Sequence, residues 1–249
     1  METLFVRNLL LEISYCGRNY HGFQVQKNAT SVQFVLQTKI QELVAHKIEI
    51  KGCSRTDTGA HALEYFAGFK TMSTIPCKGF VHALNSRLPK DIVVRDCKEK
   101  PPDFHARYST HAKEYTYKLL NSKFYDPLLD GLVHFYKYKL DYKKLDELAK
   151  AFVGQHDFRA LSAKDDKKTS FVREIYYFNV DRTADIVEFK TAGDGFLYKM
   201  VRIMVGTLLE FERRGKTTAN ILSLIESKER NNAGKTVPAC GLYLSKVIY

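Results

Sequence analysis

The sequence predicts an α+β protein built from two α/β subdomains with mostly antiparallel sheets, and three observations support this fold class. Segments with a period of two alternate along the chain with segments of helical periodicity. The first half has the order strand, helix, strand, strand, helix, strand, which is typical of helices on one face of a sheet. Two prolines within residues 100–102 favour a stiff connector, so we predict one subdomain over residues 1–102 and a second over residues 103–249.

The first half begins with an alternating segment, residues 9–15, which predicts a strand with one buried face. Thr30 and Gln33 form a capping-box pattern, and apolar residues then recur at helical spacing, so we predict a helix over residues 31–45. The alternation of residues 47–51 predicts a second strand. Further elements of this half are predicted at residues 65–71 (strand), 79–88 (helix) and 92–96 (strand).

The second half opens with a long extended pattern over residues 104–120. A helix is predicted over residues 142–152, with Asp141 as its N-cap and Gly154 beyond its end. The remaining predictions are a polar loop at residues 164–168, paired strands at 171–180 and 186–191, a short helix at 219–227 and a closing strand within 238–249.

Composition and charge narrow the classes of function. The chain has 249 residues, of which 45% are hydrophobic, so it can bury a core. Its formal net charge of +11 would attract a polyanion, of which nucleic acid is the commonest. The most apolar segment, residues 200–209, is too short to cross a bilayer. The start of the sequence has neither a cationic stretch nor a small-residue cleavage site, so we expect a cytoplasmic protein with no membrane partner.

Metal chemistry has little support in the sequence. The five cysteines are widely spaced with no C-x-x-C pair, which indicates neither a disulfide framework nor a zinc site and favours reduced, mostly packed thiols. The eight histidines are scattered without ligand spacing, and we interpret four of them as hydrogen-bonded structural residues: His61, His105, His111 and His156. A phosphate-binding glycine loop and a dinucleotide fingerprint are also missing from the sequence.

The stretch of residues 52–62 places Asp57 two residues after Arg55 and two residues before Gly59. Asp and Gly together predict a turn, because Asp can bond its own downstream backbone and Gly can take a positive φ. A side chain just beyond a strand can be held rigidly and still face a cleft. Asp57 is therefore a candidate catalytic residue, and the alternative is an exposed turn former without chemistry.

An apolar helix is predicted from about Phe196, after two closely spaced glycines. Between residues 196 and 209 its only charged side chains are Lys199 and Arg202, which a helical spacing of three places on one face. An unpaired buried charge costs several kcal/mol. Lys199 can reach solvent along its long stem, so Arg202 is the candidate for a functional pair with an acidic group elsewhere in the chain.

Residues 57–60 also match the Asp-Thr-Gly-Ala of aspartic proteases. Those enzymes need two carboxylates that share one proton. The sequence contains no second Asp-Thr-Gly or Asp-Ser-Gly, and polar residues 54–56 stand where an apolar strand should lead into the aspartate. The sequence therefore disfavours a protease.

Eight motifs follow one another over nearly the whole chain. They are Tyr20-His21-Gly22-Phe23-Gln24 with Val32-Gln33, Arg55-Thr56-Asp57-x-Gly59-x-His61-Ala62, Ala83-Leu84-Asn85 with Leu88-Pro89, Phe104-His105-Ala106-Arg107, Lys113-Glu114-Tyr115-x-Tyr117, Phe152-x-Gly154-x-His156-Asp157-Phe158, Gly195-Phe196-Leu197 with Met200-Val201-Arg202 and Val205-Gly206, and Pro238-Ala239-x-Gly241-Leu242. In this order they resemble the landmarks of the TruA-type tRNA pseudouridine synthase family. One such motif is weak, whereas eight in order are very specific.

The resemblance implies a pseudouridine synthase fold, in which the two sheets join and the active-site cleft lies between the subdomains. It also implies an isomerase that converts uridine to pseudouridine in the anticodon stem-loop of tRNA, at tRNA positions 38 to 40. Such an enzyme acts as a homodimer and uses neither a cofactor nor a metal.

Five residues acquire roles through this resemblance. Asp57 would be the essential nucleophile or base, and Arg202 would pair with it and hold it oriented. Arg55 would occupy the space that a flipped nucleotide leaves. Tyr115 would stack on the flipped base, and Leu242 would form an apolar wall of its pocket.

Three positions depart from the family pattern, since Ser54, Thr58 and Ala60 stand where the family usually has Gly, Ala and Val. We expect the chemistry to survive these changes, while the choice of uridine or of RNA is less strongly determined. The sequence leaves two alternatives open. One is an RNA-binding or tRNA chaperone protein without catalysis, and the other is a pseudouridine synthase that acts on a different RNA site.

Overall fold

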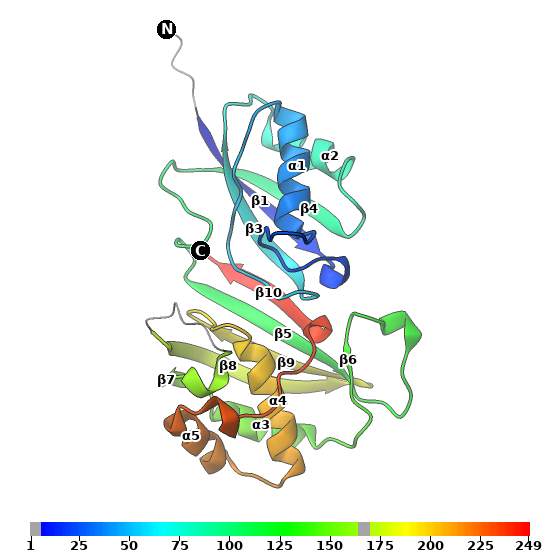
Figure 1. Cartoon of the computed structure of the whole chain (residues 1–249), viewed down its shortest axis with the longest axis vertical. Helices are drawn as coiled ribbons and strands as arrows, with labels where there is room; N and C mark the ends of the chain where they lie inside the picture. Colours follow the sequence, from blue (N-terminus) through cyan, green and yellow to red (C-terminus); the bar gives the residue numbers. More distant parts are fainter. Residues whose placement is uncertain (1–5, 164–169) are drawn as a thin grey trace. The chain divides into compact units, whose positions relative to one another are not determined.

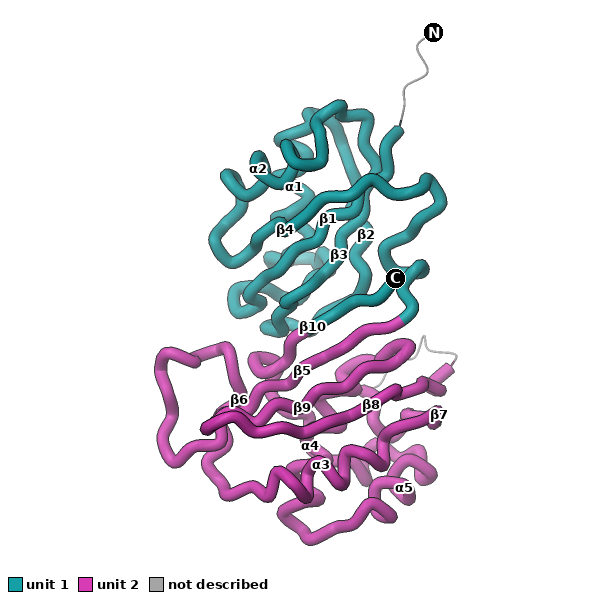
Figure 2. Tube along the Cα trace, turned by 180° about the vertical axis from the view of Figure 1, so that it is seen from behind, with its two compact units in different colours: residues 1–111, 244–249 teal, residues 112–243 magenta. Residues whose placement is uncertain are grey.

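The chain folds into two compact units, and each has helices packed against a mostly antiparallel sheet (Figures 1 and 2). The computed structural model describes residues 6–163 and 170–249. Unit 1 comprises Met1–His111 and Leu244–Tyr249, and unit 2 comprises Ala112–Tyr243. The predicted α+β class is confirmed. The polar loop predicted at residues 164–168 lies outside the described residues.

The sheet of unit 1 has the strand order β4-β1-β3-β10. Its strands are β1 (Arg7–Tyr15), β3 (His61–Thr71), β4 (Ile92–Lys100) and the unit 1 part of β10 (Leu242–Ile248), with the short β2 (Lys51–Gly52) beside β3. β1 is antiparallel to both neighbours, so that Leu11 lies opposite Ala67 on one side and Cys97 on the other. The predicted strands at 9–15, 65–71 and 92–96 are confirmed, and each observed strand is longer than predicted.

Two helices, α1 (Val32–Val44) and α2 (Cys77–Asn85), lie on one face of this sheet (Figure 1). The N-cap of α1 is Ser31, whose Oγ accepts a hydrogen bond from the Phe34 amide, so the predicted Thr30–Gln33 capping box is wrong. The Gln33 side chain has other partners, because its Nε2 donates to the Ile50 carbonyl at 3.0 Å. The buried face of α1 was predicted correctly, since its apolar positions at helical spacing pack inward.

The strand predicted over residues 47–51 forms only at its end, where β2 begins. The amides of Ile48 and Ile50 donate instead to the Gln41 and Gln37 side chains of α1, at 3.2 and 3.1 Å. A buried amide requires a partner. Because glutamine side chains supply it, this segment stays extended beside the helix without joining a ladder, although both isoleucines are buried as the alternation predicted.

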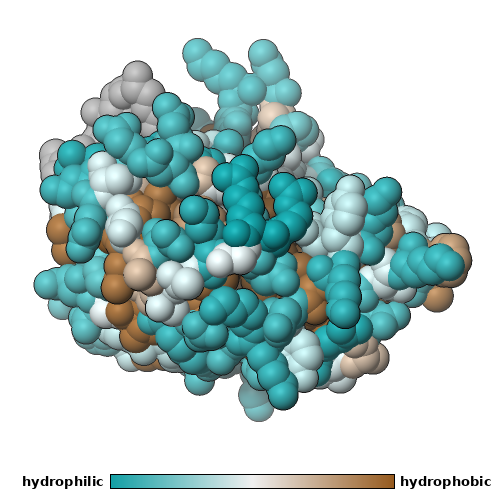
Figure 3. All heavy atoms as spheres, turned by 90° about the horizontal axis from the view of Figure 1, so that it is seen from below, coloured by the Kyte–Doolittle hydropathy of each residue, from teal (hydrophilic) through white to brown (hydrophobic). Residues whose placement is uncertain are grey.

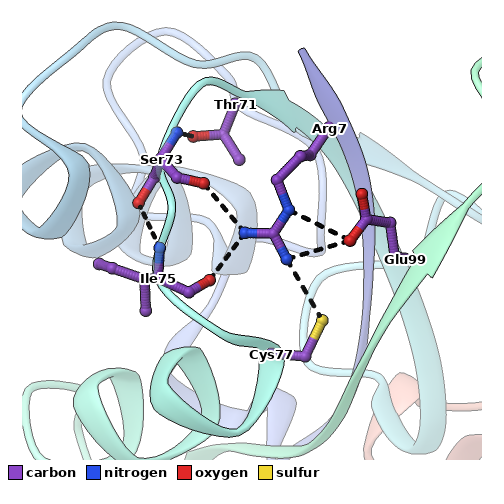
Figure 4. Close-up of polar contacts among 6 residues, drawn as sticks. All are labelled: Arg7, Thr71, Ser73, Ile75, Cys77 and Glu99. Carbon is purple, nitrogen blue, oxygen red and sulfur yellow. Dashed lines mark hydrogen bonds and ion pairs between the residues drawn. The ribbon is translucent and has the colours of Figure 1, made fainter. Parts of the chain in front are cut away.

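Arg7 ties three segments together near the start of β1 (Figure 4). Its Nη1 donates to the carbonyls of Ser73 and Ile75 at 2.9 and 2.7 Å, and its Nε donates to the Glu99 carboxylate at 3.1 Å. The two carbonyls belong to the connection between β3 and α2, and Glu99 lies on β4. The Arg7 side chain is only 14% exposed. Bonds to a charged donor are strong in such surroundings, so this guanidinium fixes the path by which the chain enters α2.

The segment after β4 stays with unit 1, and the division between units falls at residue 111, beyond the two prolines. Asn8 Nδ2 donates to the carbonyls of Pro101 and Phe104 at 2.8 and 3.0 Å. At the other end of the chain, the Tyr249 hydroxyl donates to the Ala106 carbonyl at 2.7 Å. These bonds attach both the connector and the C-terminus to the first sheet.

The sheet of unit 2 has the strand order β5-β9-β8-β7. Its strands are β5 (Ala112–Leu120), β7 (Gly154–Asp157), β8 (Val172–Thr183) and β9 (Ile186–Gly193), and the short β6 (His134–Phe135) pairs in parallel with β5. The predicted pair of strands at 171–180 and 186–191 is confirmed as the β8–β9 hairpin. Tyr117 on β5 and Val180 on β8 both lie opposite Phe189 on β9, and all three residues are buried.

The helices of unit 2 are α3 (Tyr142–Lys150), α4 (Met200–Arg213) and α5 (Thr218–Ser227), and α3 packs over β8. The predicted N-cap of α3 is confirmed, because Asp141 Oδ1 accepts a hydrogen bond from the Lys144 amide. Five short 3-10 turns complete the described chain: η1 (Gly17–Asn19), η2 (Pro127–Leu129), η3 (Arg159–Leu161), η4 (Arg230–Asn232) and η5 (Ala239–Gly241).

α4 is buried nearly all round, as predicted, but it starts at Met200 instead of Phe196. Lys199 has a φ of +60°, which a helix interior does not allow. The preceding turn is held to β8, because the Asp194 carboxylate accepts from the Glu174 amide at 3.0 Å. Lys199 therefore precedes the helix. The prediction that Lys199 and Arg202 lie on one face of this helix is wrong.

The outer surface of the molecule is largely hydrophilic on the face that Figure 3 shows, with smaller hydrophobic areas between the polar side chains. Among the described residues, no helix combines the length and apolar character that a membrane span requires.

His134 is the one described residue with a buried side-chain nitrogen, Nδ1, that has no hydrogen-bond partner. The ring stands on β6 with its edge toward Tyr117 and Tyr136, at centroid distances of 6.1 and 6.3 Å. Burial lowers the pKa of His134 to about 4. The histidine is therefore neutral at neutral pH and opposes protonation as long as unit 2 is folded.

We expect this burial to make unit 2 less stable in acid. Between pH 6.5 and 4 the unfolded chain binds a proton at His134 that the folded chain refuses, so the free energy of unfolding falls as the pH falls, by up to about 2 kcal/mol between pH 7.5 and 5. Urea unfolding at both pH values measures this difference. In His134→Gln the pH dependence should shrink by that amount. Equal pH dependence in His134→Gln and the parent would contradict the assignment.

Candidate active site

Asp57 lies in a tight turn between β2 and β3 of unit 1. The Ala60 amide donates to the Asp57 carbonyl at 3.1 Å, and Gly59 takes a φ of +80°, so the predicted turn is confirmed. The Asp57 side chain is half-buried, and Arg55 is exposed two residues earlier. One short turn thus presents a carboxylate and a guanidinium close together in sequence.

A second loop, which follows β1, packs directly against this turn. The Gly59 amide donates to the Tyr20 carbonyl at 3.1 Å, and the Gly17 amide donates to His61 Nδ1 at 3.1 Å. His61 is 2% exposed, which agrees with its predicted structural role. A Cβ atom on Gly17 would stand only 1.8 Å from the Ala60 carbonyl oxygen. The two backbones can approach this closely only because position 17 has no side chain.

Gly22 makes the same kind of contact on the residue before Asp57. Its φ is +76°, and a Cβ atom there would lie 2.3 Å from the Thr56 carbonyl oxygen. Thr56 is also held from its side chain, since its Oγ1 lies 2.9 Å from the Tyr15 hydroxyl at the end of β1. The backbone of Asp57 is therefore confined on one side by a glycine and on the other by the end of a central strand.

Aromatic side chains support the start of the turn. The Tyr65 hydroxyl, on β3, donates to the Ser54 carbonyl at 2.5 Å. Phe23 stacks on the Tyr65 ring at a centroid distance of 4.2 Å, and a Cβ atom on Gly52 would collide with both rings. The Tyr65 hydroxyl thus fixes the backbone carbonyl of Ser54.

The loop after β1 has an anchor that the sequence did not reveal. The Tyr20 hydroxyl donates to Asp91 Oδ1 at 2.6 Å, and Asn19 Nδ2 donates to Asp91 Oδ2 at 3.1 Å. Burial, followed by this hydrogen bond, raises the pKa of Tyr20. Asp91 lies 71 residues after Tyr20, and an acidic residue ahead of a strand is a common turn former, so local pattern carried no signal of the contact.

Tyr115 and Leu242 belong to unit 2. Tyr115 lies on β5, is 7% exposed and meets Phe196 edge to face at a centroid distance of 5.1 Å. Leu242 is the first residue of β10 and is also 7% exposed. Both residues are therefore buried.

Arg202 lies on α4 between the buried residues Val201 and Ile203, and it is half-buried. Its Nε donates to the Val237 carbonyl at 2.8 Å. Burial raises the pKa values of Tyr117 and Cys240, and the positive charge of Arg202 opposes the rise in both cases. The guanidinium therefore stands beside β5 and the segment that leads into β10, close to the part of unit 2 that carries Leu242.

Two glycines allow the segment before β10 to cross α4. A Cβ atom on Gly206 would lie 1.8 Å from the Lys235 carbonyl oxygen, and one on Gly234 would lie 2.6 Å from the Gly206 carbonyl oxygen. The Gly234 amide donates to Thr207 Oγ1 at 3.0 Å. Arg202 lies one helical turn before Gly206 on α4. The crossing therefore brings the Val237 carbonyl within reach of Arg202, whose Nε donates a hydrogen bond to it.

The residues predicted from the sequence thus divide between the units. Arg55 and Asp57 belong to unit 1, and Tyr115, Arg202 and Leu242 belong to unit 2. Among residues 6–163 and 170–249, no three His, Cys, Asp or Glu side chains gather as they would around a metal ion.

The fold and these residues belong to a class of RNA-modifying isomerases, and comparison with known proteins identifies the family. Residues 13–109 and 148–249 match the family described as tRNA pseudouridine synthase, and the chain belongs to this family. It is 45% identical to tRNA pseudouridine synthase A of Acetivibrio thermocellus, over 98% of this chain and all of that protein. It is 42% identical to the proteins of that name from Thermoanaerobacter sp. and Clostridium acetobutylicum, again over 98% of this chain and 100% of each relative.

We expect Gly22→Ala to lower activity strongly, because the new Cβ and the positive φ together force the Thr56–Asp57 backbone to move. The rate of tRNA modification should fall by about 100-fold or more. The control is Gly215→Ala, which shares a positive φ of +63° but has no atom within 4 Å of its Cβ position. It carries the same backbone strain without touching the turn, so it should cost stability, by about 1 kcal/mol, and retain activity. Equal activities of the two variants at matched folded fractions would argue against the role of this contact.

Proposed function

We propose that the enzyme converts uridine to pseudouridine in the anticodon stem-loop of tRNA, at tRNA positions 38 to 40, with Asp57 as its essential residue. The observation that supports the proposal is the Asp57 turn, which lies within the residues that match the family, resembles its active-site motif, and has its preceding residue Thr56 held by Gly22 and Tyr15. The names of the curated relatives supply tRNA as the substrate. The net charge of +11 suits a polyanion of this kind.

The reaction needs no co-reactant by its own balance. Isomerisation breaks the bond from the ribose to N1 of uracil and forms one to C5, while C5 gives up a proton and N1 takes one up, so there is no net gain or loss of atoms or electrons. We therefore propose that the enzyme works without a cofactor or metal. Asp57 acts as nucleophile or base while the glycosidic bond breaks, and a rigid carboxylate that is still half-exposed fits this role.

The remaining residues would position the nucleotide. A uridine inside an RNA stem has to leave the stack before its ring can be turned, and the exposed Arg55 guanidinium suits the space that it leaves. Tyr115 would stack on the flipped base, and Leu242 would close its pocket with an apolar surface. Arg202 would pair with Asp57 in the catalytic state. The family resemblance further supports a homodimer that acts in the cytoplasm, and we include both in the proposal.

Asp57→Asn should abolish pseudouridine formation and leave tRNA binding largely intact. The amide removes the negative charge and the nucleophilic oxygen while it keeps the size of the side chain. Carbodiimide primer-extension stops on tRNA measure the product, and filter binding measures the affinity. Asp185→Asn, at the exposed turn between β8 and β9, is the control and should match the parent. If the parent binds tRNA and yields no stops at any uridine, the protein is an RNA-binding protein without this activity; stops outside the anticodon arm would indicate another site.

Arg202→Gln should reduce kcat by about 10- to 1,000-fold with little change in the Kd for tRNA, because a residue that only orients the reacting group affects the chemical step. Arg202→Lys should recover part of the rate, since it restores the charge without the planar fork. Arg213→Gln, at the exposed end of the same helix, is the matched control. An Arg202→Gln enzyme with normal kcat and weakened tRNA binding would assign Arg202 to binding alone.

A further inference from the structure

Two cysteines that play no part in the proposed reaction lie side by side in unit 1. α2 runs along β4, because the Asn85 side chain both donates to the Val94 carbonyl and accepts from the Val94 amide, each at 2.8 Å. Along α2, Cys77 lies eight residues before Asn85, which is about 12 Å. Along β4, Cys97 lies three residues after Val94, which is about 10 Å. The two elements therefore bring the cysteines to the same end of α2, where Cys77 is close enough to contribute to the raised pKa of Cys97.

A guanidinium and a helix N-terminus lie beside the sulfur of Cys77. Arg7 Nη2 lies 3.9 Å from Cys77 Sγ, and the same guanidinium is fixed by the Ser73 and Ile75 carbonyls (Figure 4). Cys77 is also the first residue of the nine-residue helix α2, whose N-terminus carries partial positive charge. A fixed cation and a helix N-terminus are the features that activate a thiol toward oxidants. Cys77 is half-buried, so a small oxidant can reach it.

Cys97 differs from Cys77 in its burial. It lies on β4 with 6% exposure, and burial raises its pKa. Cys97 therefore stays protonated beside the more accessible sulfur. A half-buried sulfur near a cation and a buried thiol close to it are the two parts that a disulfide-forming pair requires.

We propose that Cys77 and Cys97 form a peroxide-oxidation site in which Cys77 is the reacting thiolate and Cys97 the resolving thiol. The Cys77 thiolate attacks one oxygen of hydrogen peroxide, the O–O bond breaks, and Cys77 sulfenic acid and hydroxide are formed. The Cys97 sulfur then displaces the hydroxyl group from Cys77, and its proton leaves with that group as water. Two thiols are oxidised to a disulfide, and the peroxide is reduced to two waters.

The bridge would join the start of α2 to β4 and remove the sulfur partner of Arg7. Both cysteines lie outside the turn that carries Asp57, so the proposal is independent of the proposed function. The site belongs to unit 1 alone, because all its residues lie within Met1–His111.

The test treats the folded, full-length protein with hydrogen peroxide and digests it with trypsin without reduction. The expected product is one cross-linked pair of peptides, residues 71–78 with residues 96–98, that is about 2 Da lighter than the sum of its reduced parts. Dithiothreitol should separate the pair. Cys16, which is also half-buried in unit 1, is the internal reference and should react at least about tenfold more slowly than Cys77.

Two variants distinguish the roles of the cysteines. In Cys97→Ser, Cys77 sulfenic acid should accumulate and be trapped by dimedone as a stable adduct, whereas Cys77→Ser should give neither the adduct nor a bridge. Circular dichroism confirms that each variant is folded. The proposal is overturned if the folded parent forms no 77–97 bridge, or if Cys16 is oxidised as fast as Cys77.

Discussion

Close contact between two backbones is the constraint on which the Asp57 turn depends. The turn lies outside any regular element, so hydrogen bonds of a helix or a ladder do not hold it in place. It is held because the loop after β1 presses Gly17 and Gly22 against the carbonyls of Ala60 and Thr56. Interiors of proteins are packed too densely to leave space for a further methyl group at such points. The position of the candidate catalytic carboxylate thus depends on two glycines, which carry no side chain.

In unit 2, glycines likewise allow two backbone segments to approach each other closely. Arg202 sits on a helix that is otherwise apolar, and a guanidinium in that place needs acceptors that a helix cannot provide. The chain supplies one by crossing α4 at Gly206 and Gly234, which brings the Val237 carbonyl to Arg202 Nε. In both units, glycines set the distance between segments far apart in the sequence, and polar side chains then use the resulting geometry.

The Arg7 cluster shows how one buried cation can serve stability and reactivity together. Its guanidinium satisfies two carbonyls of an irregular connection and pairs with Glu99 on the neighbouring strand. The Arg7 guanidinium also lies near the Cys77 sulfur, because Cys77 is the first residue of α2 and follows the connection that Arg7 binds. The helix start that Pro76 and Cys77 define therefore determines both the packing of the connection and the electrostatics of the thiol pair.

Local sequence pattern predicted most elements of the fold, and its errors have separate causes. Period-two and period-3.6 patterns located β1, α1, α3 and the β8–β9 hairpin, because burial of one face is a local property. The pattern failed at residues 47–51, where side chains of α1 bind the backbone, and at Thr30, because the neighbouring Ser31 caps α1 instead. It also placed the start of α4 too early, since the left-handed residue Lys199 has no sequence signature.

The sequence by itself determined the class of the fold, the family, and the identity of the candidate residues, because ordered motifs such as the one around Asp57 are local properties of the chain. Only the tertiary structure decided what holds those residues. Asp91 beneath Tyr20, the Val237 carbonyl at Arg202 and Cys97 beside Cys77 are contacts between segments separated by 20 residues or more. Such contacts depend on how the elements pack, and packing is set by the whole chain at once.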